Sequence, residues 1–90
     1  MIETEATVEK HLDVLVIYNG LEKTIPYNPE SPVRAIVEHA IRAFGITQQP
    51  HLLSLFTQAG VELNDNLSAE KAGVKPGDKL LLRPGAVKGG

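Results

Sequence analysis

The sequence predicts a two-layer α+β domain in which one amphipathic helix packs against a mixed β-sheet. Three observations support this prediction. Two apolar segments rich in β-branched residues flank Asn19-Gly20, a dipeptide that favours the tight turn of a β-hairpin. Residues 32–44 carry apolar side chains at spacings of three and four, the period of a helix with one buried face. Residues 79–83 (KLLLR) are typical of a central, well-buried strand.

The hairpin is expected to pair residues 12–18 (LDVLVIY) with residues 21–27 (LEKTIPY). Within the second strand, Ile25 and Tyr27 should share one face. Pro26 has no N–H to donate to a neighbouring strand, so we expect it to point outward on an edge strand.

The helix has start and stop signals at both ends. Ser31 is expected to be the N-cap, and Pro32 the first helical residue, where no N–H is needed. Gly45 supplies the left-handed stop, and Ile46 the apolar contact that follows it. The apolar face should pack on the sheet through Val33, Ile36, Val37, Ala40, Ile41 and Phe44.

The remaining segments complete the topology. Residues 52–57 (LLSLFT) predict a third strand, and residues 61–63 a short fourth one. Asn66 or Ser68 should cap a single helical turn over residues 69–72. The resulting order is that of the β-grasp architecture, with four to five strands on one main helix.

The predicted core combines the inward positions of the strands with the apolar stripe of the helix. It comprises Val14, Val16, Ile25, Tyr27, Val33, Ile36, Val37, Ala40, Ile41, Leu53, Leu55, Leu63, Val74, Leu80 and Leu82.

Length and composition exclude several classes of function. Ninety residues correspond to a single domain. We expect a flexible extension over residues 1–11, the domain over 12–83 and a flexible tail over 84–90. The net charge of −2 argues against binding to nucleic acid or to an anionic membrane. The acidic, polar first ten residues do not resemble a secretory signal, and no apolar run approaches the roughly 20 residues of a membrane helix. We therefore expect a cytoplasmic protein.

The sequence shows no constellation of catalytic or metal-binding residues. The absence of cysteine excludes disulfides, thiolate metal sites and a cysteine nucleophile. His11, His39 and His51 lack the spacing of metal ligands, and Ser31 is better explained as a helix cap than as a nucleophile. No glycine-rich phosphate loop is present. We expect neither a metal site nor intrinsic enzyme activity.

Several motifs, taken in order over residues 12–90, resemble those of ubiquitin and its relatives. The first motif, Tyr27-Asn28-Pro29-Glu30-Ser31-Pro32-Val33, leads into the helix, and the second, Phe44-Gly45-Ile46 with Gln48-Gln49-Pro50, follows the helix. The third runs from Leu53-Ser54-Leu55 through Ala59-Gly60 to Leu63-Asn64-Asp65. The last three are Leu67 through Val74, Leu80 to Arg83, and Gly89-Gly90. The resemblance implies a ubiquitin-like β-grasp domain.

The resemblance also implies a function for Gly89-Gly90. An adenylating enzyme would use ATP to activate the Gly90 carboxylate, and a conjugating enzyme would transfer it to target proteins. Gly89 has no side chain and would let the backbone enter a narrow enzyme tunnel. Arg83, Val87 and Lys88 would assist docking. The chain would bind no cofactor, would be monomeric when free, and could meet a processing or deconjugating protease.

The sequence departs from ubiquitin at positions that partners recognise. Ser54 and Arg83 stand where ubiquitin has its exposed aliphatic patch, so ordinary ubiquitin-binding domains are not expected to bind. Leu15, Ile17 and Leu81, with Ser54, are a candidate partner surface; alternatively, these apolar side chains pack against the N-terminal extension or each other.

The tail and the chain-linkage positions also differ. The tail from Pro84 to Lys88 is one residue longer, which implies a dedicated activating enzyme. Val61 and Pro76 match two chain-linkage lysines of ubiquitin, so the familiar polymers are not implied.

Three functional hypotheses remain. The first is a protein modifier, similar to prokaryotic ubiquitin-like modifiers. The second is a β-grasp sulfur carrier, similar to those of thiamine and molybdopterin synthesis, which would hold sulfur as a terminal thiocarboxylate. The third is an interaction domain that is not conjugated. The short Leu67–Val74 insert and the acidic extension favour the modifier.

Overall fold

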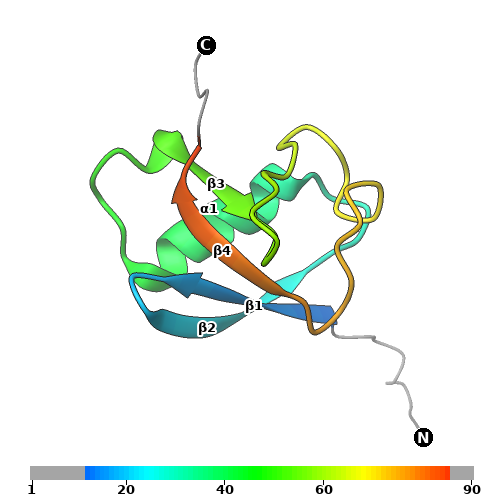
Figure 1. Ribbon diagram of the computed structural model, residues 1–90, viewed down its shortest axis with the longest axis horizontal. Helices are drawn as coiled ribbons and strands as arrows, with labels where there is room; N and C mark the ends of the chain where they lie inside the picture. The colour runs from blue at the N-terminus through cyan, green and yellow to red at the C-terminus, as the bar shows by residue number, and fades with distance from the viewer. Residues whose placement is uncertain (1–11, 86–90) are drawn as a thin grey trace, which may run out of the picture.

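The computed structural model describes residues 12–85 (Figure 1). The chain forms β1 (Leu12–Tyr18), β2 (Leu21–Tyr27), α1 (Val33–Phe44), the 3-10 turn η2 (Pro50–Leu52), β3 (Leu53–Phe56) and β4 (Lys79–Pro84). The expected extension over residues 1–11 and residues 86–90 of the expected tail over 84–90 lie outside the described residues, whereas Pro84 is the last residue of β4 and Gly85 follows it.

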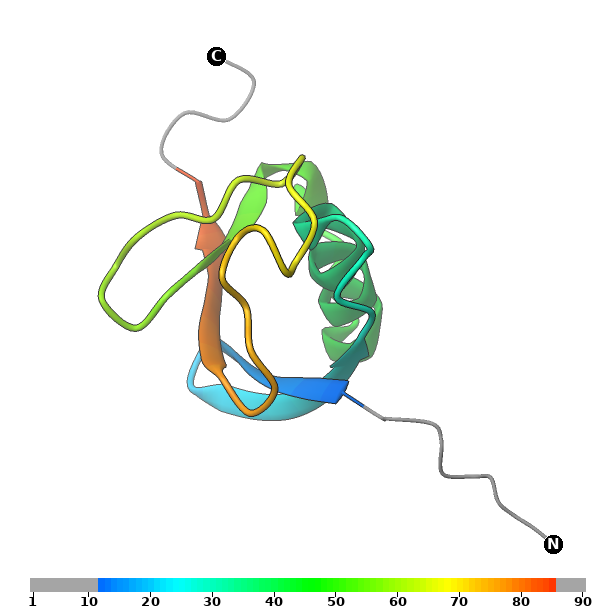
Figure 2. The same ribbon diagram turned by 90° about the vertical axis from the view of Figure 1, so that its right-hand side faces the viewer.

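The four strands form one mixed sheet in the order β2-β1-β4-β3. β4 runs parallel to β1, with Val16 opposite Leu80, and antiparallel to β3, with Leu55 opposite Leu82. The leucine-rich last strand is therefore central, as predicted. Figure 2 shows α1 on one side of this sheet, which confirms the two-layer β-grasp arrangement.

The hairpin has the predicted bounds, and its strands pair from Leu12 opposite Tyr27 to Tyr18 opposite Leu21. Asn19 and Gly20 have φ values of 54° and 79°, the left-handed pair that a tight hairpin turn needs. Pro26 pairs with Asp13 on the edge strand β2, where its missing N–H costs no pairing inside the sheet.

The two ends of α1 differ in how well they were predicted. At the C-terminal end, Gly45 has a φ of 68°, and the N–H of Ile46 donates to the Ile41 carbonyl, as the stop signal predicts. At the other end the N-cap is Pro32, without a side-chain hydrogen bond, so the prediction of Ser31 as the cap is wrong.

Backbone groups of a distant loop replace the expected cap. The N–H of Val33 donates to the Leu67 carbonyl at 2.8 Å, and that of Arg34 to the Asp65 carbonyl at 3.1 Å. The free donors of the first helical turn are thus satisfied by chain more than thirty residues away, which no local pattern indicates.

The core follows the prediction at thirteen of its fifteen positions. Tyr27 and Ile41 are only half-buried and pack against the edge of the core. Phe56 and Ala69 are buried although the pattern did not select them. The buried apolar residues are Val14, Val16, Ile25, Val33, Ile36, Val37, Ala40, Leu53, Leu55, Phe56, Leu63, Ala69, Val74, Leu80 and Leu82.

Three shorter elements differ from the prediction. Residue 52 belongs to η2, so β3 begins at Leu53. The expected fourth strand at 61–63 is a single bridge between Phe56 and Glu62, held by bonds from the Leu63 N–H to the Leu55 carbonyl and from the Thr57 N–H to the Val61 carbonyl. Residues 69–72 form a hydrogen-bonded turn rather than a helix, and the Ser68 hydroxyl caps it by accepting from the Lys71 N–H at 3.1 Å.

Candidate functional site

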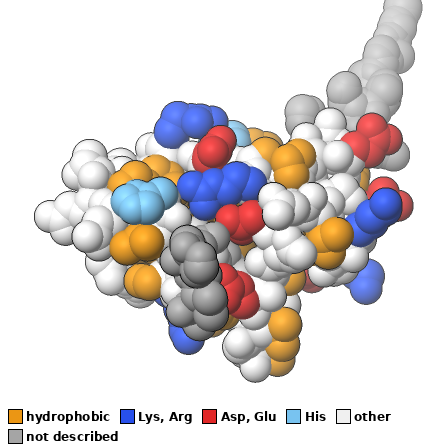
Figure 3. Space-filling view, turned by 90° about the horizontal axis from the view of Figure 1, so that it is seen from above, with side chains coloured by type: hydrophobic (Ala, Val, Ile, Leu, Met, Phe, Trp, Pro, Cys, Tyr) orange, Lys and Arg blue, Asp and Glu red, His pale blue; other side chains and the backbone are white. Residues whose placement is uncertain are grey.

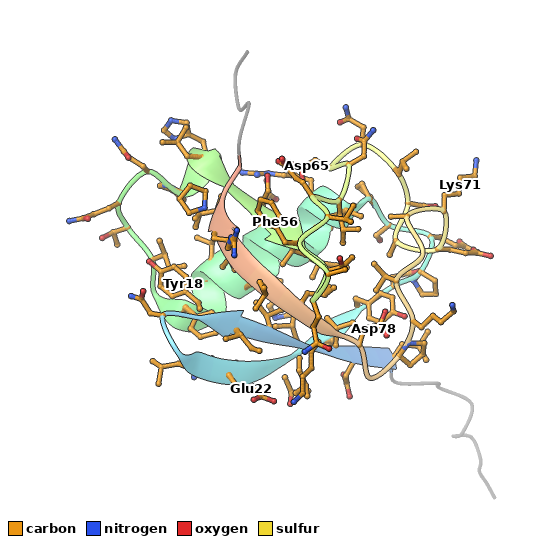
Figure 4. The ribbon with its side chains drawn as sticks, in the orientation of Figure 1. Tyr18, Glu22, Phe56, Asp65, Lys71 and Asp78 are labelled. Carbon is orange, nitrogen blue, oxygen red and sulfur yellow. The ribbon has the colours of Figure 1, made fainter. Side chains whose placement is uncertain are left out.

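A row of apolar side chains crosses the face of the sheet that α1 does not cover. Ile17 of β1 lies opposite Leu81 of β4, which lies opposite Phe56 of β3. A carboxylate stands at each end of the row, because Glu22 pairs with Ile17 and Glu62 bridges to Phe56. Figure 4 labels Glu22 beside β2 and Phe56 beside β3. We call Ile17, Leu81 and Phe56 the outer row; an apolar centre with a charged rim is typical of protein-binding surfaces.

Arg83 covers one end of the outer row. Its guanidinium carbon lies 4.8 Å from the centre of the Phe56 ring, within the range of a cation–π contact. Phe56 is only 7% exposed as a result of this cover and its neighbours, whereas Arg83 itself is exposed. Arg83 therefore presents a cation on the same face as the outer row, where a partner can reach it.

A shallow groove borders the outer row at the carboxyl ends of the parallel strands β1 and β4. These strands are paired only as far as Ile17 and Leu81. Beyond that point the groove has a volume of about 220 Å³ and is lined by Ile17, Tyr18, Asn19, Leu81, Leu82, Arg83 and Pro84. The groove leads from the outer row to the end of β4.

The chain leaves the sheet at Gly85 through a narrow notch. The Gly85 N–H donates to the Leu52 carbonyl at 2.9 Å. A Cβ atom on Gly85 would lie 2.8 Å from the Ser54 hydroxyl and 2.5 Å from a Glu62 carboxylate oxygen. We call Leu52, Ser54, Glu62 and Gly85 the exit notch.

Ser54 lies at the bottom of the exit notch. It is fully buried, and its hydroxyl finds no hydrogen-bond partner among residues 12–85. The expectation that Ser54 belongs to an exposed partner surface is therefore wrong. Its side chain points to the outer face, but Gly85 approaches it closely from above.

Arg34 of α1 forms polar contacts with residues close to the exit notch. Its Nη1 lies 3.3 Å from the Leu53 carbonyl and 3.4 Å from the Asp65 carboxylate, and its Nε lies 3.5 Å from Glu38. Because Leu53 follows Leu52, the hydrogen bond from Arg34 to the Leu53 carbonyl connects α1 to the chain next to the exit notch. Figure 3 views this end of the molecule, where basic side chains lie between acidic ones.

The structure brings together only part of the predicted site. Leu15, Ile17 and Leu81 are half-buried on the outer face with Arg83, and their role as a partner surface stays a prediction. The predicted conjugation residues Gly89 and Gly90 and the docking residues Val87 and Lys88 lie outside the described residues.

Sequence reasoning missed Phe56, Glu62 and Gly85. The alternation of β3 carried one usable signal. With Leu53 and Leu55 inward, Phe56 must point outward, and an outward aromatic residue requires a cover.

Further properties of residues 12–85 concern metal-binding groups, shifted pKa values and membrane-spanning helices. Within residues 12–85, no group of three or more His, Asp or Glu side chains could hold a metal ion. Tyr27 has a raised pKa, because burial and the Asp78 carboxylate both disfavour the phenolate. No helix in the described part of the chain is long and apolar enough to cross a membrane.

Comparison with known proteins identifies the fold. No protein-family model and no curated protein matches the chain. Among solved structures, a de novo protein designed on the basis of ubiquitin matches with a TM-score of 0.72 and 21% identity, covering 88% of this chain and 94% of that one. Ubiquitin from Caldiarchaeum subterraneum matches with a TM-score of 0.69 and 24% identity, covering 90% and 100%.

A third match comes from a larger protein. A crystal structure of ATBAG1 in complex with HSP70 gives a TM-score of 0.70 and 17% identity over 84% of this chain and 41% of that one. At these identities the matches establish the fold alone. The chain has a ubiquitin-like β-grasp fold.

Proposed function

We propose that this chain is a ubiquitin-like protein modifier that is joined to target proteins through the carboxylate of Gly90. The observation that carries the proposal is a ubiquitin-like fold whose central strand β4 leads, through the exit notch, toward the glycine pair Gly89-Gly90. The absence of side chains on both glycines allows close approach from all sides.

In this proposal the chain supplies the electrophile and its partners supply catalysis. An adenylating enzyme transfers AMP from ATP to the Gly90 carboxylate and releases pyrophosphate. A thiol of the activating or conjugating enzyme then displaces AMP and forms a thioester. An amine of the target attacks the thioester carbonyl, the thiol leaves, and an amide bond remains. ATP is bound by the activating enzyme rather than by this chain.

Ile17 and Leu81 of the outer row, together with Arg83, are the proposed docking surface for these enzymes. The surface combines half-buried aliphatic side chains with an exposed guanidinium, and it borders the groove that leads to the end of β4. A partner held there would lie next to the end of β4, from which the chain continues through Gly85 toward Gly90. A processing or deconjugating protease would need the same access, and we propose a cytoplasmic location for the pathway.

The test is mass spectrometry of the chain, carrying an N-terminal affinity tag, produced in the cells that encode it. A matched variant lacks only Gly89 and Gly90. We expect covalent adducts of the intact chain on other proteins, with the Gly90 carbonyl joined to an amine, and none for the truncated variant.

Two other outcomes would contradict the proposal. A free chain whose mass shows one oxygen replaced by sulfur, without adducts, would identify a sulfur carrier. The same species and the same bound proteins for both chains would identify an interaction domain that is not conjugated.

A further inference from the structure

Gly85 differs from the other glycines of the described chain. Gly20, Gly45, Gly60, Gly73 and Gly77 have φ values between 68° and 89° and have open space where a Cβ atom would lie. They are required for backbone conformation. Gly85 does not have a positive φ, and its Cβ position is filled by its neighbours. Among the glycines of residues 12–85, Gly85 alone therefore lacks room for a Cβ atom.

The two atoms that fill this position are not equally able to move. Glu62 is exposed, and its carboxylate is the far end of a flexible side chain. Ser54 is fully buried, and its hydroxyl has little room to turn away. The Ser54 hydroxyl is therefore the group that keeps a side chain on residue 85 out of the exit notch. A methyl group 2.8 Å from it would push the backbone outward and weaken the bond from the Gly85 N–H to the Leu52 carbonyl.

We propose that Gly85 is a positioning residue, which fixes the point where the segment carrying the reactive carboxylate leaves the domain. This inference rests on the proposed function. A fixed exit point at Gly85 restricts the directions in which the chain can continue from the domain, and this favours entry of the segment into an enzyme site when the enzyme is docked on the outer row.

The arrangement also assigns a role to Ser54. A larger side chain at this position would occupy the path of the chain, and a smaller one would relieve the clash created by a methyl group on residue 85. Ser54 on β3 and Gly85 directly after β4 thus form a matched pair of small residues. Any effect of enlarging Gly85 should be corrected by shortening Ser54.

The test uses four full-length chains: wild type, Gly85→Ala, Ser54→Ala and the double variant. Hydrogen exchange of the residue 85 amide, followed by NMR, reports the fixed point directly. We expect exchange in Gly85→Ala to be roughly fivefold faster than in wild type, as loss of one hydrogen bond predicts. In the double variant we expect it to return to the rate in Ser54→Ala. The amount of covalent adduct in cells reports the function, and it should follow the same order.

The outcomes separate the inference from the proposed function. Unchanged amide exchange in Gly85→Ala would overturn the fixed point. Faster exchange with undiminished adducts would overturn the positioning role. A loss of adducts that Ser54→Ala does not rescue, accompanied by a lower melting temperature, would show a purely structural role. If wild type itself forms no adducts, the proposed function fails, and the positioning role with it.

Discussion

The two faces of the sheet are both closed to solvent near β3, but by different parts of the chain. On one face, Leu53 and Leu55 pack against the continuous apolar stripe of α1. On the other face, Ser54 and Phe56 are covered by isolated groups: the bridge to Glu62, the Arg83 guanidinium and the backbone of Gly85. A helix covers a sheet through a repeating pattern, whereas loops and strand ends cover it through single contacts without a repeat.

The largest expected effect tests whether the face under α1 holds most of the stability. Leu55→Ala removes a fully buried side chain beneath the helix and should lower the free energy of unfolding by about 3 kcal/mol. Leu81→Ala is the matched control, because Leu81 is a half-buried leucine on the opposite face of the same sheet. We expect it to cost about 1 kcal/mol in urea unfolding. Equal losses would show that the outer face is packed as a second core.

Ser54→Ala tests the quality of packing on the outer face. A buried hydroxyl without a partner costs free energy, so its removal should stabilise the domain by about 1 kcal/mol. Ser68→Ala is a control of opposite sign, because the Ser68 hydroxyl accepts a hydrogen bond from the Lys71 N–H. It should destabilise by about 0.5–1 kcal/mol. Destabilisation by Ser54→Ala in thermal unfolding would contradict the assignment of an unsatisfied hydroxyl.

The contrast between the faces explains what could be predicted from the sequence. Alternation in the first strand selected Val14 and Val16 correctly, and the helical period selected Val33 and Val37 correctly, because each pattern is local. The cover of Ser54 depends on Gly85, which lies 31 positions away and has no distinctive backbone angle. Resemblance to ubiquitin placed Ser54 on an exposed patch for the same reason, since the resemblance carried no information about a residue that passes above it.

Predictions from local sequence also failed where contacts with the loop between β3 and β4 determine the structure. Ser31 was a good candidate for the helix cap, but the Leu67 and Asp65 carbonyls satisfy the first N–H groups of α1. The bridge at Glu62 likewise takes the place of a fourth strand. A loop whose own sequence shows no period can be located only by tertiary contacts.

Arg83→Ala tests a smaller contribution to stability, that of the Arg83 guanidinium packed over the Phe56 ring. Loss of the cation–π contact and its packing should cost about 0.5–1 kcal/mol. A double-mutant cycle with Phe56→Leu separates the contact from the bulk of either side chain. A coupling energy near zero would show that Arg83 is held over the ring without stabilising it, and would leave the guanidinium free for partners.

The smallest effect concerns Tyr27, where the helix-facing core meets the end of β2. Burial, with a further contribution from the Asp78 carboxylate, raises the pKa of Tyr27 above the ordinary value of 10.0. The folded state therefore favours the protonated phenol. Its contribution to stability is complete below pH 10 and is lost as the pH rises from 10 through the folded pKa.

Unfolding free energies measured between pH 8 and pH 11 test this sign. Wild type should lose stability above pH 10 more steeply than Tyr27→Phe, which has no phenol to ionise. Asp78→Asn should retain most of the wild-type slope, because burial is the larger cause of the shift. A wild-type slope equal to that of Tyr27→Phe would show that water reaches the hydroxyl freely. A slope abolished by Asp78→Asn would make the carboxylate, rather than the edge of the core, the main influence on Tyr27.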